Sequence, residues 1–369
     1  MFNLDRSKND TSVTLDLLRA VAAQMVCVGH AISFAYGWQP ARLPLMQNVG
    51  VLLFFMLSGF LITYTLIERS KNPDYGFGQF FIERFARIYS GLIPALALVV
   101  VVDGITIYLT GDQTIARYYG LPTFLVNLVM FEDYRGSLSN YDALQWSAFG
   151  SASPLWTLAI EWHIYLFVAA VYFIGARMRS IPLLIVVAIV FGQMPAHYLI
   201  GALSEAGVGR GLFTLWLGGC MTYFAMQHIK PAYWPMVAVS VLAALAFSAT
   251  TAAGAEYSFR GYAILLVFFL AFMLASQARR VITSQSVNRA IQFFADYSFS
   301  LYLVHHTIMI SMWTIFSVRG LPFLVVAIVL SNILAIGLAQ IGEKHHRKLA
   351  QTLLQWRQST SKISPPAAS

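Results

Sequence analysis

The stretch from Leu15 to Tyr36 constrains the fold most, because it is apolar and long enough to span a bilayer yet carries Asp16, Arg19 and His30. On an α-helix, the eleven steps from Arg19 to His30 rotate the chain by about 1100°, which is about 20° past three full turns. Both side chains therefore project from one face of the helix, about 16 Å apart along its axis. Asp16 precedes Arg19 by three residues and joins that face. Such side chains are costly in lipid, so this face is predicted to line a protein interior or a water-filled cavity.

Composition extends this interpretation to the whole chain of 369 residues, which is 58% hydrophobic and only 11% charged. A soluble domain carries about a quarter charged residues, whereas apolar runs of about 20 residues are typical of a polytopic membrane protein. We predict an all-α membrane helix bundle at residues 1–345, followed by a basic cytoplasmic tail at 346–369. About ten transmembrane helices are expected, at 15–36, 49–68, 90–109, 154–174, 181–200, 211–227, 234–252, 260–277, 291–316 and 321–341.

The distribution of basic residues predicts the orientation of these spans. With a cytoplasmic N-terminus, 17 of the 24 Lys and Arg residues fall in cytoplasmic segments and 6 in outer ones. This is the positive-inside pattern, so both termini are expected in the cytoplasm. The net charge of +8 is then a feature of topology and does not indicate a nucleic-acid partner.

Two connections between spans are long. Residues 77–88 place phenylalanines at helical spacing between charged residues, which predicts an amphipathic helix at the cytoplasmic interface. The outer segment 110–153 contains an apolar piece too short to span the membrane, so it either dips back into the protein or lies at the outer surface. The tail predicts a basic interfacial helix ending in a disordered SPPAAS terminus.

Three titratable residues fall at similar predicted depth in the outer half of the membrane, namely His30, Glu161 and His305. This suggests that they converge in one cavity. An imidazole can remove a proton from an attacking hydroxyl, and a carboxylate can orient that imidazole. Tyr302 shares a helix face with His305, and Ser58 lies near the middle of the second span.

Arginines gather at the opposite side of the predicted membrane. Arg19, Arg84 and Arg87 lie near the cytoplasmic face, where guanidinium groups suit a phosphate-bearing donor. Simpler interpretations stay open from the residues alone: snorkelling or positive-inside charges for the arginines, structural hydrogen bonds for the histidines and Glu161, and helix packing for Ser58. No metal-binding or phosphate-loop motif is found, so no metal is expected.

Five blocks of sequence follow one another along the chain. The first is an arginine, ten residues and a histidine in LDLLRAVAAQMVCVGH. The others are GVLLFFMLSGFLIT, RFARIYSGLIP, SPLWTLAIEWHIYL and YSFSLYLVHH, at 50–63, 84–94, 153–166 and 297–306. Together they span most of the chain, and in this order they resemble the integral membrane acyltransferase family 3. Two positions depart from the family pattern: Ser90–Gly91, where a proline often follows, and Trp162–His163, where Glu-Gln is frequent.

The resemblance implies roles for particular residues. His30 falls on the family's essential histidine and is the expected base, with Glu161 and His305 as further catalytic candidates. Arg19, Arg84 and Arg87 fall on positions linked to the acyl donor. Asp16, Ser58 and Tyr302 complete the candidate site.

The resemblance also implies an activity and a location. The expected activity is transfer of an acyl group other than aminoacyl, by O-acetylation of a polysaccharide, with acetyl-CoA as the donor substrate and no tightly bound cofactor. The expected partners are acyl-CoA, a glycan or lipid-linked saccharide acceptor and membrane lipids, and the location is the bacterial cytoplasmic (inner) membrane. The chain resembles a stand-alone member without an appended soluble hydrolase-like domain. A small-molecule or lipid acceptor, or a polytopic transporter, remains the alternative.

Overall fold

In a computed structural model, every regular element of the described residues is helical. These residues are 9–37, 43–134, 146–176, 181–204 and 209–363. The longer helices are α1 Thr11–Tyr36, α2 Met46–Arg69, α3 Phe77–Thr110, α6 Leu155–Gly175, α7 Ile181–Ser204, α8 Leu212–His228, α9 Tyr233–Thr250, α10 Phe259–Ala278, α11 Gln285–Asp296, α12 Ser298–Phe316, α13 Gly320–Ile341 and α14 His346–Ile363. The short ones are α4 Gln113–Ala116, α5 Leu121–Leu128, and the 3₁₀ turns η3 Ala255–Tyr257 and η4 Glu343–His345.

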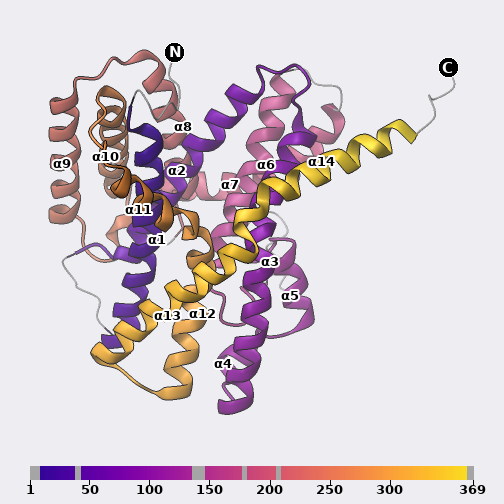
Figure 1. Cartoon of the computed structure of the whole chain (residues 1–369), viewed down its shortest axis with the longest axis vertical. Coiled ribbons are helices and arrows are strands. Elements are labelled where there is room, and N and C mark those ends of the chain that lie inside the picture. The colour runs from indigo at the N-terminus through magenta and orange to yellow at the C-terminus, as the bar shows by residue number, and fades with distance from the viewer. Residues whose placement is uncertain (1–8, 38–42, 135–145, 177–180, 205–208, 364–369) are drawn as a thin grey trace.

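The bundle is built around α1, which packs against α2, α12 and α13 (Figure 1). In the described part of the chain, nine helices are long and apolar enough to cross a membrane. The remaining predicted span corresponds to α8, whose 17 residues reach the lower end of the spanning range. The prediction of an all-α polytopic membrane bundle is therefore confirmed. The start of α1, the end of α2 and the start of α3 lie on the same side of the bundle (Figure 1).

Close helix contacts depend on small residues. At Gly59 of α2, a Cβ atom would overlap the backbone carbonyl of Trp216 in α8. At Gly219 of α8, a Cβ atom would overlap the carbonyl oxygen of Met56 in α2. The two helices thus approach backbone to backbone, a packing that membrane helices achieve with glycine.

The prediction of a separate interfacial helix at 77–88 is wrong, because these residues form the first turns of the 34-residue helix α3. Pro94 lies inside α3 without ending it. The aromatic stripe of Phe77, Phe81, Phe85 and Tyr89 runs along the helix with successive ring centroids 6.5, 6.0 and 4.1 Å apart. It packs on the aromatic rings of α6 rather than on lipid, since the Phe81 centroid is 5.7 Å from that of Trp162.

The predicted span at 291–316 is also divided. Its first turns belong to α11, and α12 begins at Ser298 after Tyr297, whose ψ of 8° interrupts the helix. The reason is local: α11 is amphipathic and carries Arg289 and Asp296, whereas α12 is apolar and mostly buried. The apolar residues of α11 made the predicted span too long at its start, because they belong to a separate helix.

The outer segment dips into the protein. The hydroxyl of Tyr89 in α3 donates a 2.8 Å hydrogen bond to the carbonyl of Leu128, the last residue of α5. Tyr89 is two residues from Arg87, so α5 reaches the depth of the arginine-bearing turn of α3. Within this outer segment, residues 135–145 lie outside the described residues.

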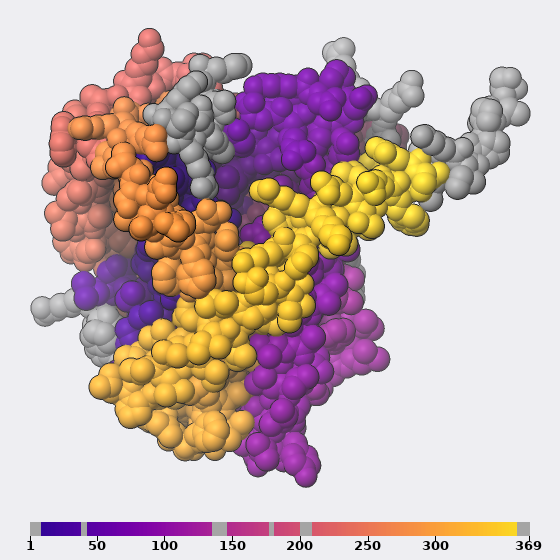
Figure 2. All heavy atoms as spheres, viewed as in Figure 1, coloured from indigo at the N-terminus to yellow at the C-terminus, as the bar shows by residue number. Residues whose placement is uncertain are grey.

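The tail forms α14, which lies across the surface over α3 (Figure 2). Its sequence is polar and basic, with exposed Trp356 among charged residues, as predicted for an interfacial helix. The predicted disordered end, 364–369, lies outside the described residues.

Candidate functional site

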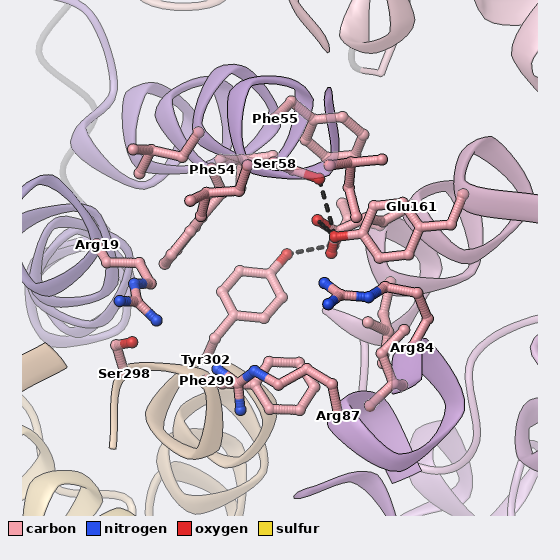
Figure 3. A pocket seen from close by; sticks show the side chains of 18 residues that line it. Arg19, Phe54, Phe55, Ser58, Arg84, Arg87, Glu161, Ser298, Phe299 and Tyr302 are labelled. Carbon is pink, nitrogen blue, oxygen red and sulfur yellow. Dashed lines mark hydrogen bonds between the residues drawn. The ribbon is translucent and has the colours of Figure 1, made fainter. Parts of the chain in front are cut away.

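Three arginines converge on a cavity of about 150 Å³ between α1, α2, α3, α6 and α12 (Figure 3). Arg19 enters from α1, while Arg84 and Arg87 enter from one turn of α3. We call this space the arginine cavity. Its polar lining also includes Ser58, Thr157, Glu161, Tyr165, Ser298 and Tyr302, and its apolar lining includes Val51, Phe54, Phe55, Leu57, Leu61, Ile62, Ile88, Leu158 and Phe299.

Each arginine of the cavity keeps a buried donor without a partner in the part of the chain that the structure describes. These atoms are Arg19 Nε, Arg84 Nε and Arg87 Nη1. Arg19 forms an ion pair with Asp16, and the Arg84 guanidinium lies 5.9 Å from the centre of the Phe80 ring. Because an unpaired buried donor is unfavourable, the arrangement is suited to an anionic ligand with several acceptor oxygens.

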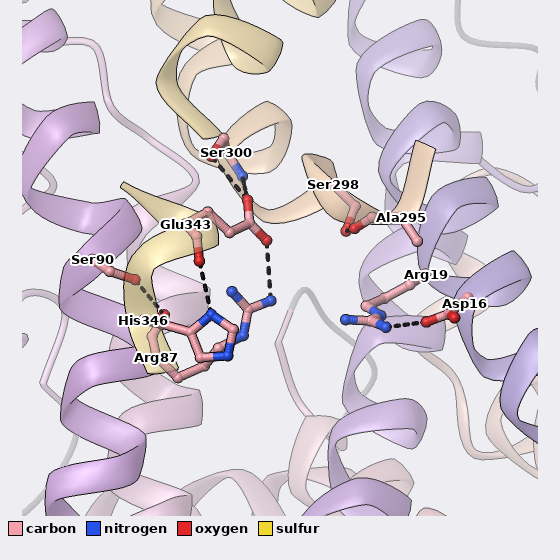
Figure 4. Close-up of polar contacts among 9 residues, drawn as sticks. All are labelled: Asp16, Arg19, Arg87, Ser90, Ala295, Ser298, Ser300, Glu343 and His346. Atoms are coloured by element: carbon pink, nitrogen blue, oxygen red, sulfur yellow. Dashed lines mark hydrogen bonds and ion pairs between the residues drawn. The ribbon is translucent and has the colours of Figure 1, made fainter. Parts of the chain in front are cut away.

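Arg87 is held by Glu343 of η4, the 3₁₀ turn that precedes the tail helix α14 (Figure 4). Its Nη2 donates to Glu343 Oε1 at 3.0 Å, and the other carboxylate oxygen accepts from Ser300 N at 3.1 Å and Ser300 Oγ at 2.9 Å. His346 Nδ1 lies 2.8 Å from the carbonyl of Glu343. One carboxylate of η4 therefore joins α3 and α12 at Arg87, a residue that lines the arginine cavity.

Glu161 belongs to the arginine cavity. Its Oε1 accepts a 2.5 Å hydrogen bond from the Tyr165 hydroxyl, which lies 2.9 Å from Ser58 Oγ. Ser58 also accepts a 3.1 Å bond from Trp216 Nε1. The positive charges of Arg84 and Arg87 lie near enough to interact with the Glu161 carboxylate (Figure 3).

A second polar group, the histidine cluster, consists of His30, His305 and His306. The centroid of the His30 ring lies 5.2 Å from that of His305 and 5.7 Å from that of His306. His30 comes from α1 and the other two from α12. His305 is fully buried, whereas His30 is half-buried.

Backbone carbonyls fix the tautomers of two of these histidines. His305 Nδ1 lies 2.9 Å from the carbonyl of Tyr302, and His306 Nδ1 lies 2.7 Å from the carbonyl of Ser151. A carbonyl oxygen only accepts hydrogen bonds, so each Nδ1 carries the proton and each neutral ring keeps a bare Nε2. In the described residues, His305 Nε2 is buried and has no partner.

Asp103 fixes the turn that contacts His306. Its Oδ2 accepts from Ser151 N at 2.8 Å, and its Oδ1 lies 2.6 Å from Ser151 Oγ. Ser151 Oγ is also 2.8 Å from Thr307 Oγ1 of α12. Sequence reasoning missed this set, although a carboxylate inside the apolar run of the third span was a signal that could have found it.

The structure brings together only some of the predicted site residues. The three arginines, Ser58, Glu161 and Tyr302 line the arginine cavity, Asp16 pairs with Arg19, and His30 meets His305. Glu161 lies among the arginines and is not brought to His30, so the expected convergence of Glu161 with both histidines is not seen. Tyr165 and Trp216 join the site without having been predicted.

Together, these features define a polytopic all-α membrane protein with an anion-suited cavity beside a cluster of three histidines. The model of the acyltransferase domain family matches residues 13–340, so the chain belongs to this family of membrane acyltransferases. This agrees with the resemblance in the sequence. The transporter alternative finds no support in this match.

Curated relatives are similar at low identity. Nodulation protein 10 of Rhizobium leguminosarum bv. viciae is 26% identical over 234 residues, covering 60% of each protein. Peptidoglycan O-acetyltransferase OatA of Listeria monocytogenes serovar 1/2a is 26% identical over 330 residues, 80% of this chain and 49% of the relative. The O-acetyl transferase of Shigella phage Sf6 is 25% identical over 268 residues, 69% of this chain and 74% of the relative. The chain thus spans about half to three fifths of the length of the first two relatives, and no solved structure matches.

Proposed function

We propose that this acyltransferase moves an acyl group, acetyl in the simplest case, from cytoplasmic acyl-CoA to a hydroxyl of a cell-surface glycan or its lipid-linked precursor. The observation that carries the proposal is that the same two helices contribute to both polar groups. α1 provides Arg19 and His30, and α12 provides Tyr302 and His305. A donor lying along these helices would have its charged part at the arginines and its reactive end toward the histidines.

The donor side follows from charge and size. The diphosphate and phosphate groups of CoA suit Arg19, Arg84 and Arg87, which line the cavity and each keep a buried donor without a partner among the described residues. A space of about 150 Å³ holds a group about as large as benzene, so only the acyl end of the donor would lie inside the cavity and the phosphates would meet the arginines at its edge. The rest of the CoA would extend toward the cytoplasmic side.

The acceptor side centres on His30. Its partial exposure makes it reachable by a hydroxyl, and its neighbour His305 offers a bare acceptor nitrogen. His30 takes the hydroxyl proton as the oxygen attacks the thioester carbonyl. The C–S bond breaks, the C–O ester bond forms, and the proton passes from His30 to the departing CoA thiolate.

The orientation completes the proposal. The positive-inside distribution supports cytoplasmic termini, with Arg19, Arg84 and Arg87 on the donor side and His30 toward the outer side of a bacterial cytoplasmic membrane. The names of two relatives, a peptidoglycan O-acetyltransferase and an O-acetyl transferase, support an acceptor of the glycan class.

The test uses the full chain in two assays. Purified protein in lipid nanodiscs is given acetyl-CoA, and released CoA thiol is measured. Surface glycans from cells with and without the gene are compared by mass spectrometry for the loss of one acyl mass. We expect CoA release by the wild type and none above background by His30→Ala, with both proteins eluting alike on gel filtration. Full glycan acylation by His30→Ala would overturn the site assignment, and an unchanged glycan mass without the gene would overturn the acceptor class.

A further inference from the structure

Tyr302 lies between the two polar groups of the site. Its side chain lines the arginine cavity, and its ring centroid is 6.1 Å from that of His305. The ring projects into the middle of the cavity-lining side chains (Figure 3). Any group that passes from the arginines toward the histidine cluster along α12 meets this ring.

The Tyr302 ring is held at both ends. Its hydroxyl forms a hydrogen bond with Thr157 Oγ1 and lies 3.5 Å from the carbonyl of Pro154, at the start of α6. The ring makes a T-shaped contact with the Phe54 ring of α2, with centroids 5.5 Å apart and planes at 72°. Tyr302 is only 8% exposed, so the ring has little room to rotate away.

Resting on the proposed function, we propose that Tyr302, together with Phe54, forms the wall at the acyl end of the arginine cavity and restricts the donor to a short acyl group. The wall borders the place that the reactive carbonyl would take, between the phosphate-binding arginines and the histidines. Each further methylene of the acyl chain would have to displace one of two packed aromatic rings. Close-packed interiors resist such overpacking, so longer chains are excluded by shape.

The test measures CoA release from acetyl-, butyryl- and hexanoyl-CoA by the nanodisc-embedded protein. We expect the wild type to use acetyl-CoA at least tenfold better than hexanoyl-CoA, in the range that a few methylenes give in a shaped apolar pocket. Tyr302→Ala should raise the hexanoyl-to-acetyl ratio about tenfold. Tyr302→Phe keeps the ring and should keep the wild-type ratio, although it removes the hydrogen bond to Thr157. Phe316→Ala, an exposed aromatic at the far end of the same helix, is the matched control and should change nothing.

The outcomes separate the two proposals. If the wild type releases CoA from none of the three donors, the proposed function fails. If the wild type is active and Tyr302→Ala keeps its chain-length ratio, only the role of Tyr302 is overturned. If Tyr302→Ala is inactive with all three donors, the hexanoyl-to-acetyl ratio is measured on Phe54→Ala instead, because this variant removes the other ring of the wall. A raised ratio supports the proposal, and an unchanged ratio overturns it.

Discussion

His305 presents its unpartnered Nε2 in a cluster whose nearest ring is that of His30, with the two ring centroids 5.2 Å apart. The opposite ring nitrogen is bound to the Tyr302 carbonyl at 2.9 Å. The Tyr302 carbonyl thus fixes Nδ1 as the donor and leaves Nε2 as a free acceptor. An orienting group acts on a catalytic histidine in the same way. The acceptor nitrogen nearest to His30 in this cluster is therefore offered by a neighbouring imidazole, whereas the carboxylate of Glu161 lies among the arginines.

The free Nε2 of His305 can be tested by two amide substitutions. A glutamine side chain places a polar atom near the position of Nε2, and an asparagine side chain places one near Nδ1. We expect His305→Gln to keep about a tenth or more of the wild-type kcat, and His305→Asn to lose about a hundredfold or more, within the usual range of acid–base contributions. CoA release at saturating acetyl-CoA measures both. Equal loss in the two variants, with normal gel-filtration behaviour, would show that Nε2 has no special role.

The ion pair between Arg87 and Glu343 should be strongly coupled. The Glu343 side chain is 4% exposed, so removing either partner leaves buried groups unsatisfied, at a cost of about 3–5 kcal/mol. We expect the double variant Arg87→Ala/Glu343→Ala to be less destabilised than the sum of the single variants, with a coupling energy of about 1–3 kcal/mol. Denaturant unfolding in detergent, followed by tryptophan fluorescence, measures it.

The control for this cycle is the pair Arg69–Glu83, with nitrogen and oxygen 2.9 Å apart but the Arg69 side chain 59% exposed. Solvent screens this pair, so its coupling should be below about 1 kcal/mol. Similar coupling energies in the two cycles would mean that the Arg87–Glu343 pair does not organise the cavity.

The sequence could predict relationships along one helix but not the lateral direction of each helix face. Arg19 and His30 share a face of α1 because the helical period is a local property. Glu161 was expected beside His30 because the two have similar depth. The depth of Glu161 in the membrane does not determine which neighbouring helix its carboxylate faces. In the structure, α6 packs against α3 and α2, and the carboxylate lies near Arg84, Arg87 and Ser58.

Long-range contacts of loops were beyond sequence reasoning for a similar reason. The carbonyl that fixes His306 belongs to Ser151, in a turn whose position depends on Asp103 of α3. No local sequence pattern indicates that this turn, or the Ser151 carbonyl within it, contacts α12. Likewise, the aromatic stripe of α3 has the same period whether it faces lipid or the rings of α6.

The contact between α2 and α8 predicts a sharp difference between two glycines. A Cβ at Gly59 would overlap the Trp216 carbonyl, whereas a Cβ at Gly337 of α13 meets nothing within 4 Å. We expect Gly59→Ala to destabilise the protein by about 1–3 kcal/mol through overpacking, and Gly337→Ala to be tolerated. Apparent melting temperatures in detergent test this, and equal values for the two variants would contradict the backbone-to-backbone approach.

Glu132, in the outer segment after α5, should make stability depend on pH. It is 1% exposed, its Oε2 has no partner among the described residues, and burial raises its pKa well above the usual range. In the unfolded chain its pKa returns to about 4.3. The folded state therefore holds a proton that the unfolded state releases, so stability falls as pH rises from about 4.3 toward the folded pKa, by up to about 1.4 kcal/mol per pH unit.

Glu132→Gln keeps the shape of the side chain and removes its titration. We expect its melting temperature to fall less than that of the wild type between pH 5 and pH 8, so that the variant is the more stable protein at the upper end. Asp74→Asn, at an exposed carboxylate in the loop before α3, should follow the wild-type curve. A Glu132→Gln curve parallel to the wild type would mean that this carboxyl ionises without cost in the folded protein, and that the α5 end is open to water.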